Sequence, residues 1–476
     1  MQARTRVFLS SISVGFVASL VAAGLIMAGC SSISQITSTI TSSPTVSVPV
    51  SITDAPGDQV LAASLTLNSI VLTDSSGKTA SILPSPLTFE AAHLDAVQEP
   101  LFTPAVPEDT YTSAQLTYSN AQVAYIDPTA KQVVIATATL ANTSQTLTFS
   151  SPVTVSNGST SLLIDFLVAQ SVSISGSTVT VTPAFHISAV PIPQQPTNGT
   201  NGLQCGVKGR VSALGTNSFT LTSPQGSSLV INVNANTQYQ GLPGFNALAV
   251  NMVVEVDLQT QRDGSLLALR IEEEVPPNAT AQMLVGPVTG VSGTPATSFT
   301  MLVRQKVGPV PAATPIEKDT ITINGSTNFM MPGRFNALAF AGLPFTPTFS
   351  ASTLFAGQAV AVATNGVTNN SATAIAVAMA PQTVSGTITS LATPICLGCP
   401  NQYLLTLPSG SWLATVTGQT TVTVYTNGAI QAINSTAAAV NSSVRFNGFL
   451  FQVNGKLVML AAIEADGAGN AIGPHP

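Results

Sequence analysis

Charged side chains are scarce in this sequence. Asp, Glu, Lys and Arg make up 7% of its 476 residues, whereas about 25% is ordinary for a soluble protein. Long amphipathic helices need a charged outer face, so few are expected. The basic residues form no cluster, and because binding to a phosphate backbone needs clustered Lys and Arg, nucleic acid is not an expected partner. The abundance of Thr and Val favours pleated sheets instead, and we predict an all-β fold.

Signatures of catalysis are also missing. The sequence has no G-x-S-x-G nucleophile elbow, no H-E-x-x-H motif and no P-loop, and histidine occurs only three times. We therefore predict no catalytic residues and no cofactor. The alternative is an exported hydrolase in which His93 and Asp95, with Glu90 and Glu99 nearby, form a base–carboxylate pair, or in which the loop around Asp54 takes part.

The amino-terminal residues have the layout of a secretory signal. A short positive region precedes an apolar stretch over residues 7–27, and two small residues then lead into Cys30. This arrangement resembles a bacterial lipobox, which implies removal of residues 1–29, acylation of Cys30 and anchoring at the cell envelope. Ser31 resembles a sorting signal for the outer membrane. The alternative is that residues 7–27 remain as a transmembrane helix, because about 20 apolar residues can span a bilayer.

After a Ser/Thr-rich tether over residues 30–44, a β-sandwich is predicted for residues 45–190. Apolar and polar residues alternate strictly over residues 46–53, and further short runs of this kind are separated by turn-forming residues. Many short strands at this spacing are typical of a sandwich.

Three segments of this region carry a family resemblance. They are V-S-I-T-D-A-P at residues 50–56, D-T-Y-T-S-A-Q-L at residues 109–116 and L-L-I-D-F at residues 162–166. They resemble motifs of domain-of-unknown-function family 4382, with Asp109 in place of the usual Gly and Gln115 in place of Arg. The resemblance covers about residues 46–190 and implies export and a β-sandwich, but no reaction.

Beyond a linker at residues 191–202 the chain repeats itself. Phe-Asn-Ala-Leu-Ala occurs at residues 245–249 and again at residues 335–339, and each unit begins with a Gly-x-β-branched step. In the first unit we expect five strands and a short helical turn, which is typical of a small OB-like barrel. The predicted β-barrel repeats are residues 203–275, 281–381 and, as a weak third copy, 382–467, followed by a tail over 468–476.

These units carry a second family resemblance. The Gly-x-Val start, the Ser-Phe-Thr hairpin and the Thr237 turn resemble domain-of-unknown-function family 5666, which occurs in tandem in exported bacterial proteins. The resemblance is good for the first unit, fair for the second and weak for the third, and it implies no activity. The repeated Phe245 and Phe335 are expected to plug the barrel ends as core residues, with a ligand platform as the alternative.

Cysteine is rare, with four in the chain. Cys396 and Cys399 form a C-x-x-C motif, which elsewhere is redox-active or half of a zinc site. No second pair completes a zinc site, so in an oxidising compartment we predict a disulfide between the two. Cys205 is left without an obvious partner.

A further pair of candidate residues is Asp54 and Asp58, in the T-D-A-P-G-D loop. Two carboxylates four residues apart with a glycine between them can ligate calcium, whereas Asp54 also suits an Asx-type turn that ends the strand. The pair is therefore predicted as either a turn or a calcium site. Glu272–Glu274 is expected to be a solvated strand end. Trp412, the only tryptophan, is expected in the core, with sugar stacking as the alternative.

These features predict a non-catalytic exported lipoprotein that presents β-domains for envelope binding or for structural spacing. Its partners are then a membrane, through the lipid anchor, and a glycan or an envelope protein, because low charge and Thr- and Ser-rich faces suit weak polar contacts. The alternatives are an exported hydrolase and a carbohydrate-binding accessory protein. An enzyme should bring His93 and carboxylates together in a concave pocket, whereas a spacer should leave them scattered on the surface.

Overall fold

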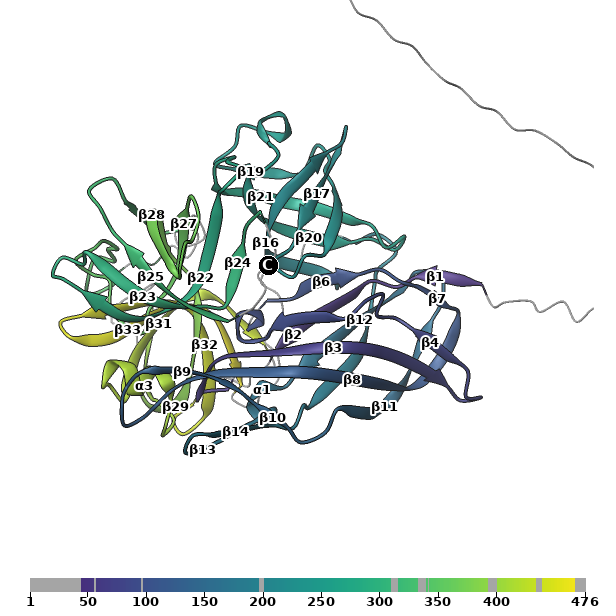
Figure 1. Ribbon diagram of the computed structural model, residues 1–476, viewed down its shortest axis with the longest axis horizontal. Coiled ribbons are helices and arrows are strands. Elements are labelled where there is room, and N and C mark those ends of the chain that lie inside the picture. The colour runs from purple at the N-terminus through teal and green to yellow at the C-terminus, as the bar shows by residue number, and fades with distance from the viewer. Residues whose placement is uncertain are drawn as a thin grey trace, which may run out of the picture. The chain divides into compact units, whose positions relative to one another are not determined.

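The computed structural model describes most of the chain after residue 43. The described residues are 44–54, 57–95, 97–196, 201–309, 316–332, 340, 342–392, 400–433 and 439–466, with no side chains described for 428–433 and 463–466. Nearly every element is a strand and the helical segments are short (Figure 1). The predicted all-β class, a sandwich followed by barrels, is confirmed.

Two larger sheets form the sandwich. One has the strand order β11-β8-β3-β4, with β5 and β9 also attached, and the other has the order β15-β12-β2-β6. Their facing apolar side chains, among them Leu65, Leu116 and Ile164, are fully buried in one core. The strands are β1 (Thr45–Ser47), β2 (Val50–Asp54), β3 (Val60–Asp74), β4 (Thr79–Ser81), β5 (Leu87–Glu90), β6 (Glu99–Phe102), β7 (Ala105–Pro107), β8 (Asp109–Ile126), β9 (Val133–Thr137), β10 (Thr139–Leu140), β11 (Ser144–Val155), β12 (Thr160–Phe166), β13 (Val172–Ser175), β14 (Thr178–Val181) and β15 (Phe185–Pro191). The helical turns are η1 (Ala92–Leu94) and α1 (Val168–Ser171).

The first barrel follows the order β18-β17-β16-β20-β21-β19 and closes where β18 pairs with β21. Phe219, Ile231 and Val256 point into its core. Its elements are β16 (Leu203–Leu214), β17 (Ser218–Thr222), β18 (Ser228–Asn232), β19 (Gln238–Gln240), η2 (Phe245–Ala247), β20 (Val253–Thr260) and β21 (Leu266–Val275).

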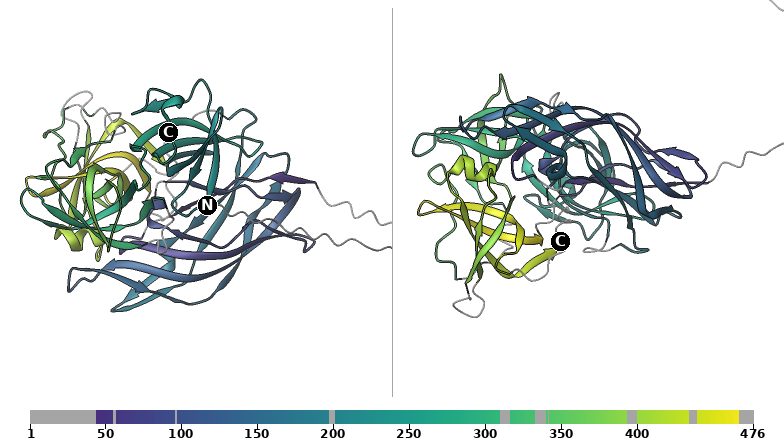
Figure 2. Two further views of the ribbon diagram at one scale, coloured as in Figure 1. Left: turned by 45° about the horizontal axis from the view of Figure 1, so that its top comes forward. Right: turned by 90° about the horizontal axis from the view of Figure 1, so that it is seen from below.

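The second and third barrels repeat this plan. The second runs β23-β25-β28-β27-β22-β24 with an additional β23–β22 pairing, and the third is the closed barrel β29-β30-β31-β33-β32 (Figure 2, green to yellow). The second contains β22 (Gln282–Ser292), β23 (Ser298–Val303), β24 (Gln305–Val307), β25 (Glu317–Thr322), β26 (Asn328–Met330), β27 (Ala359–Thr364) and β28 (Ser371–Met379). The third contains β29 (Gln382–Ala392), β30 (Asn401–Thr406), α3 (Trp412–Thr417), β31 (Thr421–Ile433), β32 (Ser443–Val453) and β33 (Lys456–Asp466).

The glycine that opens each unit has a packing reason. A Cβ on Gly209 would lie 2.5 Å from the Leu221 side chain and 2.8 Å from the carbonyl oxygen of Thr222. At Gly286 the nearest carbonyl oxygen would be 1.9 Å away, and at Gly386 it would be 2.7 Å away. These distances leave no room for a side chain, so the first strand of each barrel needs glycine where the next strand crosses it.

Residues 43–476 form a single compact unit, and hydrogen bonds join the domains within it. The Gln204 side chain of the first barrel donates to Ser51 Oγ of the sandwich at 2.7 Å. The backbone N–H of Trp412 donates to the carbonyl oxygen of Asp58 at 2.9 Å. In the part of the chain that the structure describes, no helix has the length and apolarity needed to cross a bilayer.

Candidate functional site

A cavity of about 140 Å³ is lined by residues of the sandwich and of all three barrels. Of the 26 described residues that line it, seven are Asp, Glu, Lys or Arg, although such residues are only 7% of the chain. The sandwich contributes His93, Asp95 and Glu99. The first barrel contributes Lys208, Glu255, Glu272 and Glu274, and the second contributes Arg304. The scarce charges are therefore concentrated at this one place.

The turn η1, between β5 and β6, holds His93 between two carboxylates. Its Nδ1 lies 3.1 Å from Glu90 Oε2 and its Nε2 lies 3.2 Å from Glu99 Oε1. Burial lowers the pKa of His93, but the charge of Glu99 and the hydrogen bond to Glu90 raise it to about 10. The ring is thus an imidazolium at neutral pH, with both nitrogens engaged, and it does not have the free nitrogen that a general base requires.

Glu90 fixes the turn that carries the histidine. Its carboxylate accepts hydrogen bonds from the backbone N–H groups of Ala63, Ala92 and His93 at 3.0, 2.8 and 2.9 Å. The sequence places a glutamate just before η1, where a carboxylate satisfies N–H groups that would otherwise be buried without partners.

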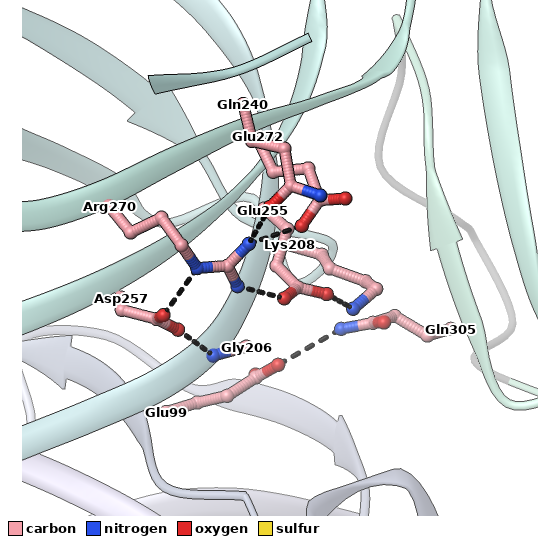
Figure 3. Close-up of polar contacts among 9 residues, drawn as sticks. All are labelled: Glu99, Gly206, Lys208, Gln240, Glu255, Asp257, Arg270, Glu272 and Gln305. Atoms are coloured by element: carbon pink, nitrogen blue, oxygen red, sulfur yellow. Dashed lines mark hydrogen bonds and ion pairs between the residues drawn. The ribbon is translucent and has the colours of Figure 1, made fainter. Parts of the chain in front are cut away.

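Glu99 joins three domains. Besides its contact with His93, it accepts hydrogen bonds from Gln225 of the first barrel and Gln305 of the second, each at 2.9 Å. Burial raises the pKa of Glu99, but the positive charge of His93 and the hydrogen bonds from His93 and Gln225 outweigh burial and lower it. An ionised Glu99 is therefore a structural centre of the site (Figure 3).

Arg304 extends from the second barrel toward the sandwich. Its Nε donates to the carbonyl oxygen of Leu61, and its guanidinium lies 5.9 Å from the ring centroid of Trp412. Burial lowers its pKa, and the nearby carboxylates of Glu90, Asp95 and Asp54 oppose that shift. The half-buried Trp412 thus packs against a protein cation, a favourable cation–π arrangement.

Asp54 and Asp58, the predicted turn or calcium pair, lie in different surroundings. Asp54 is fully buried, and its Oδ1 accepts from the Val168 N–H at 3.2 Å. Residues 55–56 of the predicted turn lie outside the described residues, so the turn stays a prediction. Burial, together with the charges of Asp95, Asp165 and Glu90, raises its pKa well above the usual value.

Asp58 instead faces the third barrel. Burial raises its pKa, opposed by a hydrogen bond from Ser385 and the charge of Arg445. Among the described residues, no group of three or more His, Cys, Asp or Glu is arranged to hold a metal ion. Calcium binding at Asp54 and Asp58 therefore stays a prediction.

An ion-pair network covers one face of the first barrel (Figure 3). Arg270 binds Asp257 at 2.7 Å, Glu255 at 2.8 Å and also Glu272, and Lys208 binds Glu255. These carboxylates raise the pKa of Arg270 against the effect of burial.

Glu272–Glu274 was expected to be a solvated strand end, and this prediction is wrong. Glu272 is paired with Arg270 inside the molecule, and Glu274 lines the cavity. Burial, and then the charge of Glu255, raises the pKa of Glu274 to about 7. Nothing in the sequence indicates that this end of β21 lies at a cavity lined by other domains.

Two acceptor atoms beside the cavity have no hydrogen-bond partner in the described structure. The Asn447 side chain, 4% exposed, donates through Nδ2 to Thr383 Oγ1 at 3.0 Å, and its Oδ1 has no donor. Asp95 is hydrogen-bonded to Thr383, and its Oδ1 also has no donor. Burial raises the pKa of Asp95, opposed by Thr383 and by the charges of Arg445 and Arg304. Buried acceptors of this kind usually find a partner, so they mark a place for a ligand or water.

The same positions of two barrels meet at the cavity. In the first barrel, Lys208, Glu255 and Glu272 are register partners on β16, β20 and β21. One residue before the opening glycine of the second barrel stands Val285, whose register partners on β27 and β28 are Ala361 and Ala378. All six residues line the cavity. One repeat therefore supplies a charged wall, and the next supplies an apolar wall from equivalent positions.

The other residues singled out in the sequence have different positions. Cys205 is buried on β16 and lines the cavity. Phe245 packs against the core of the first barrel. Outside the described residues lie Cys30, Phe335, Cys396 and Cys399, so acylation and the disulfide stay predictions.

The fold and the cavity define a multidomain all-β protein whose first barrel carries the charged wall. Residues 208–272, within this barrel, match the family described as "Domain of unknown function (DUF5666)". The resemblance seen in the first repeat is thereby confirmed. The match includes Lys208, Glu255 and Glu272. No curated protein matches the chain.

Proposed function

We propose that this chain is a non-catalytic, exported lipoprotein of the cell envelope that binds a small polar ligand in the cavity between its β-domains. The lipid on Cys30 would anchor it, and Ser31 would direct it to the outer membrane. The observation that carries the binding role is the concentration of ionisable side chains around one cavity in a chain with very few of them.

Energetics support binding over simple spacing. Removing a charge from water costs several kcal/mol even when it is paired, so apolar contacts would hold the domains of a spacer together at lower cost. Here His93, Glu99 and Arg304 are buried at contacts between domains. Such contacts hold the domains in one arrangement, which a cavity with walls from four domains requires. The Thr- and Ser-rich outer faces would remain for weak contacts with glycans or envelope proteins.

An acid–base hydrolase is the second candidate, because His93, Asp95 and Glu99 do lie together at a cavity. Asp95 and Glu274, both with raised pKa, would then be the acid and base. Binding is favoured because His93 has both ring nitrogens in ion pairs. An Asp95→Asn variant that binds a ligand normally while losing turnover of it would instead support the enzyme.

The family proposals are finer than the match at residues 208–272. We propose that residues 46–190 belong to domain-of-unknown-function family 4382, and that the second and third barrels are further copies of the matched domain. The parallel pairing of Val50–Asp54 with Leu162–Phe166 supports the assignment of residues 46–190, because it puts two of the motif segments side by side. The opening glycine supports the assignment of the later barrels, because it meets the same steric restriction in all three barrels.

Native mass spectrometry of the full chain, extracted from its own envelope in mild detergent, tests the binding role. A retained small molecule is expected, and it should be lost in Ala378→Leu, which fills the cavity, but kept in Thr373→Leu on the exposed side of the same strand. Equal occupancy in both variants would contradict a ligand in this cavity. The same spectra report whether residues 1–29 are removed and Cys30 is acylated, with Cys30→Ala as the control.

A further inference from the structure

We propose that the cavity binds a small aliphatic amine, with its ammonium group at Asp95, Asn447 and Glu274 and its alkyl chain along the second barrel. This inference rests on the proposed binding function and names the chemical class of the ligand. It follows from the unpartnered acceptors, the charges and the opposed walls of the cavity, taken in that order.

The cavity offers two unpartnered acceptors, and each of its three side-chain amides already donates a hydrogen bond. Asn447 Oδ1 and Asp95 Oδ1 are buried and have no hydrogen-bond donor. In contrast, the side-chain amides of Gln305, Gln382 and Asn447 donate to Glu99, to the Gly357 carbonyl and to Thr383. A ligand that only donates hydrogen bonds fits this surface, and an ammonium group is such a ligand. A neutral sugar would also need donors from the protein.

The charges point the same way. Three cationic side chains and five carboxylic side chains line the cavity. His93 is paired with Glu99, Lys208 with Glu255, and Glu272 with Arg270. Asp95 lies near the charges of Arg445 and Arg304, and burial raises its pKa against both. Burial, and then the charge of Glu255, raises the pKa of Glu274 to about 7, so this carboxyl is partly protonated at neutral pH. A ligand cation would relieve this repulsion.

The part of the cavity lining that comes from the second barrel suits a hydrocarbon chain. Val285, Ala361 and Ala378 occupy the positions that are charged in the first barrel, and Met379 and Phe449 line the cavity nearby. The volume of about 140 Å³ has room for roughly five water molecules at about 30 Å³ each. An unbranched amine of about five to eight heavy atoms therefore fits, with its polar end on one repeat and its alkyl part on the other.

Titration calorimetry on the full chain in mild detergent tests the proposal, with 1,4-diaminobutane and butylamine as probes. Saturable binding is expected, and it should weaken at least fivefold in Glu274→Gln and in Asp95→Asn. The matched control is Glu273→Gln, the neighbouring position on β21, which does not line the cavity and should bind like the wild type. 1-Butanol keeps the alkyl chain but lacks the charge, and should not bind.

The pH dependence gives a second reading. Glu274 faces Glu255 from β20, Lys208 from β16, and Glu272 and Arg270 from its own strand. Because its pKa is about 7, the carboxyl ionises between pH 6 and pH 8, and amine binding should tighten by up to about tenfold over that interval. Glu274→Gln should remove this dependence, whereas Glu273→Gln should retain it.

Four results would contradict the proposal of an amine ligand, and they differ in which other conclusions they leave intact. Saturable binding of glucose without binding of either amine would leave a ligand-binding cavity of another class, and so would binding of calcium chloride alone. Binding of the amines with equal affinity in all three variants would place them elsewhere on the molecule. A ligand retained in the native spectra but displaced by none of these probes would also refute the amine and leave the binding function intact.

Discussion

Replacing Arg304 with methionine is the sharpest test of how the domains are held together. The guanidinium lies among the carboxylates of Glu90, Asp95 and Asp54, donates to the Leu61 carbonyl and packs on Trp412. Removing one partner from a buried charge group costs about 3–5 kcal/mol, because the remaining charges are left uncompensated. Methionine keeps the apolar volume, so the loss reports on charge rather than on a cavity.

The size of the loss should depend on pH. Burial already raises the pKa of Asp54 and Asp95, and without Arg304 both should rise further. A carboxyl whose pKa is higher in the folded than in the unfolded chain contributes stability that is complete below its ordinary pKa and is lost as the pH rises through the folded-state value. Arg304→Met should therefore be closest to the wild type near pH 4.5 and furthest from it at pH 8.

Urea denaturation at the two pH values, followed by tryptophan fluorescence, measures the difference, since Trp412 lies beside the substituted residue. Arg262→Met is the matched control, because Arg262 also donates through Nε to a backbone carbonyl, that of Ile192, at 3.2 Å. The control should cost no more than about 1 kcal/mol. A loss at Arg304 no larger than at Arg262, or one of equal size at both pH values, would refute the account of a cation balancing buried carboxylates.

Three further predictions concern single sites. Both carboxylate oxygens of Asp319 are buried without hydrogen-bond partners, and burial with the charge of Glu317 raises its pKa to about 6. At pH values above 6, D319N should therefore raise the urea midpoint by the equivalent of about 1–2 kcal/mol. Near pH 4 it should have little effect. Gly286→Ala should destabilise by more than about 3 kcal/mol or prevent folding, because its Cβ would lie 1.9 Å from a carbonyl oxygen, whereas Gly325→Ala, with nothing within 4 Å, should change the midpoint by less than about 1 kcal/mol. The pKa of His93, about 10, predicts ring ¹⁵N shifts typical of imidazolium from pH 6 to pH 8, and its stabilising contribution should be complete below pH 6.5 and lost toward pH 10; titration near pH 6.5 would show that the pairing with Glu90 and Glu99 is wrong.

The fold could be predicted because its signals are local. The alternating residues 46–53 form the end of β1 and most of β2, and Ile52 lies inside the sandwich core. The glycine steps at Gly209, Gly286 and Gly386 mark the same crossing in each barrel, and close packing there admits no side chain. The third unit has the weakest sequence match of the three and still forms a closed barrel, because closure needs the pattern of strands rather than the identity of their residues.

Only some of the residues that line the cavity could be predicted from the sequence. His93, Asp95 and Glu99 were noticed as a local group, and they do line the cavity. Arg304 and Asn447 were not singled out, because their hydrogen-bond partners, such as Leu61 and Thr383, lie more than 60 positions away in the sequence. One sign was present: charged residues are unusual in a chain with 7% charge, and Arg304 directly follows the apolar residues 301–303 at the end of β23.

The three barrels suggest how a binding site can form beside a fold whose stability does not depend on that site. The positions that hold Lys208, Glu255 and Glu272 in the first barrel hold Val285, Ala361 and Ala378 in the second, although the adjoining glycines pack alike. In the third barrel the corresponding register pair is Ser385 and Arg445, and both face Asp58.

The outward-facing residues next to the repeated glycine can therefore differ from barrel to barrel, because they do not contribute to the barrel core. Once the barrels pack against one another, those differing faces are buried together, and a charged face opposite an apolar one creates a cavity with two chemical halves. The selectivity of such a cavity would come from the pairing of repeats, so an isolated first barrel should keep its ion pairs and still lack the site.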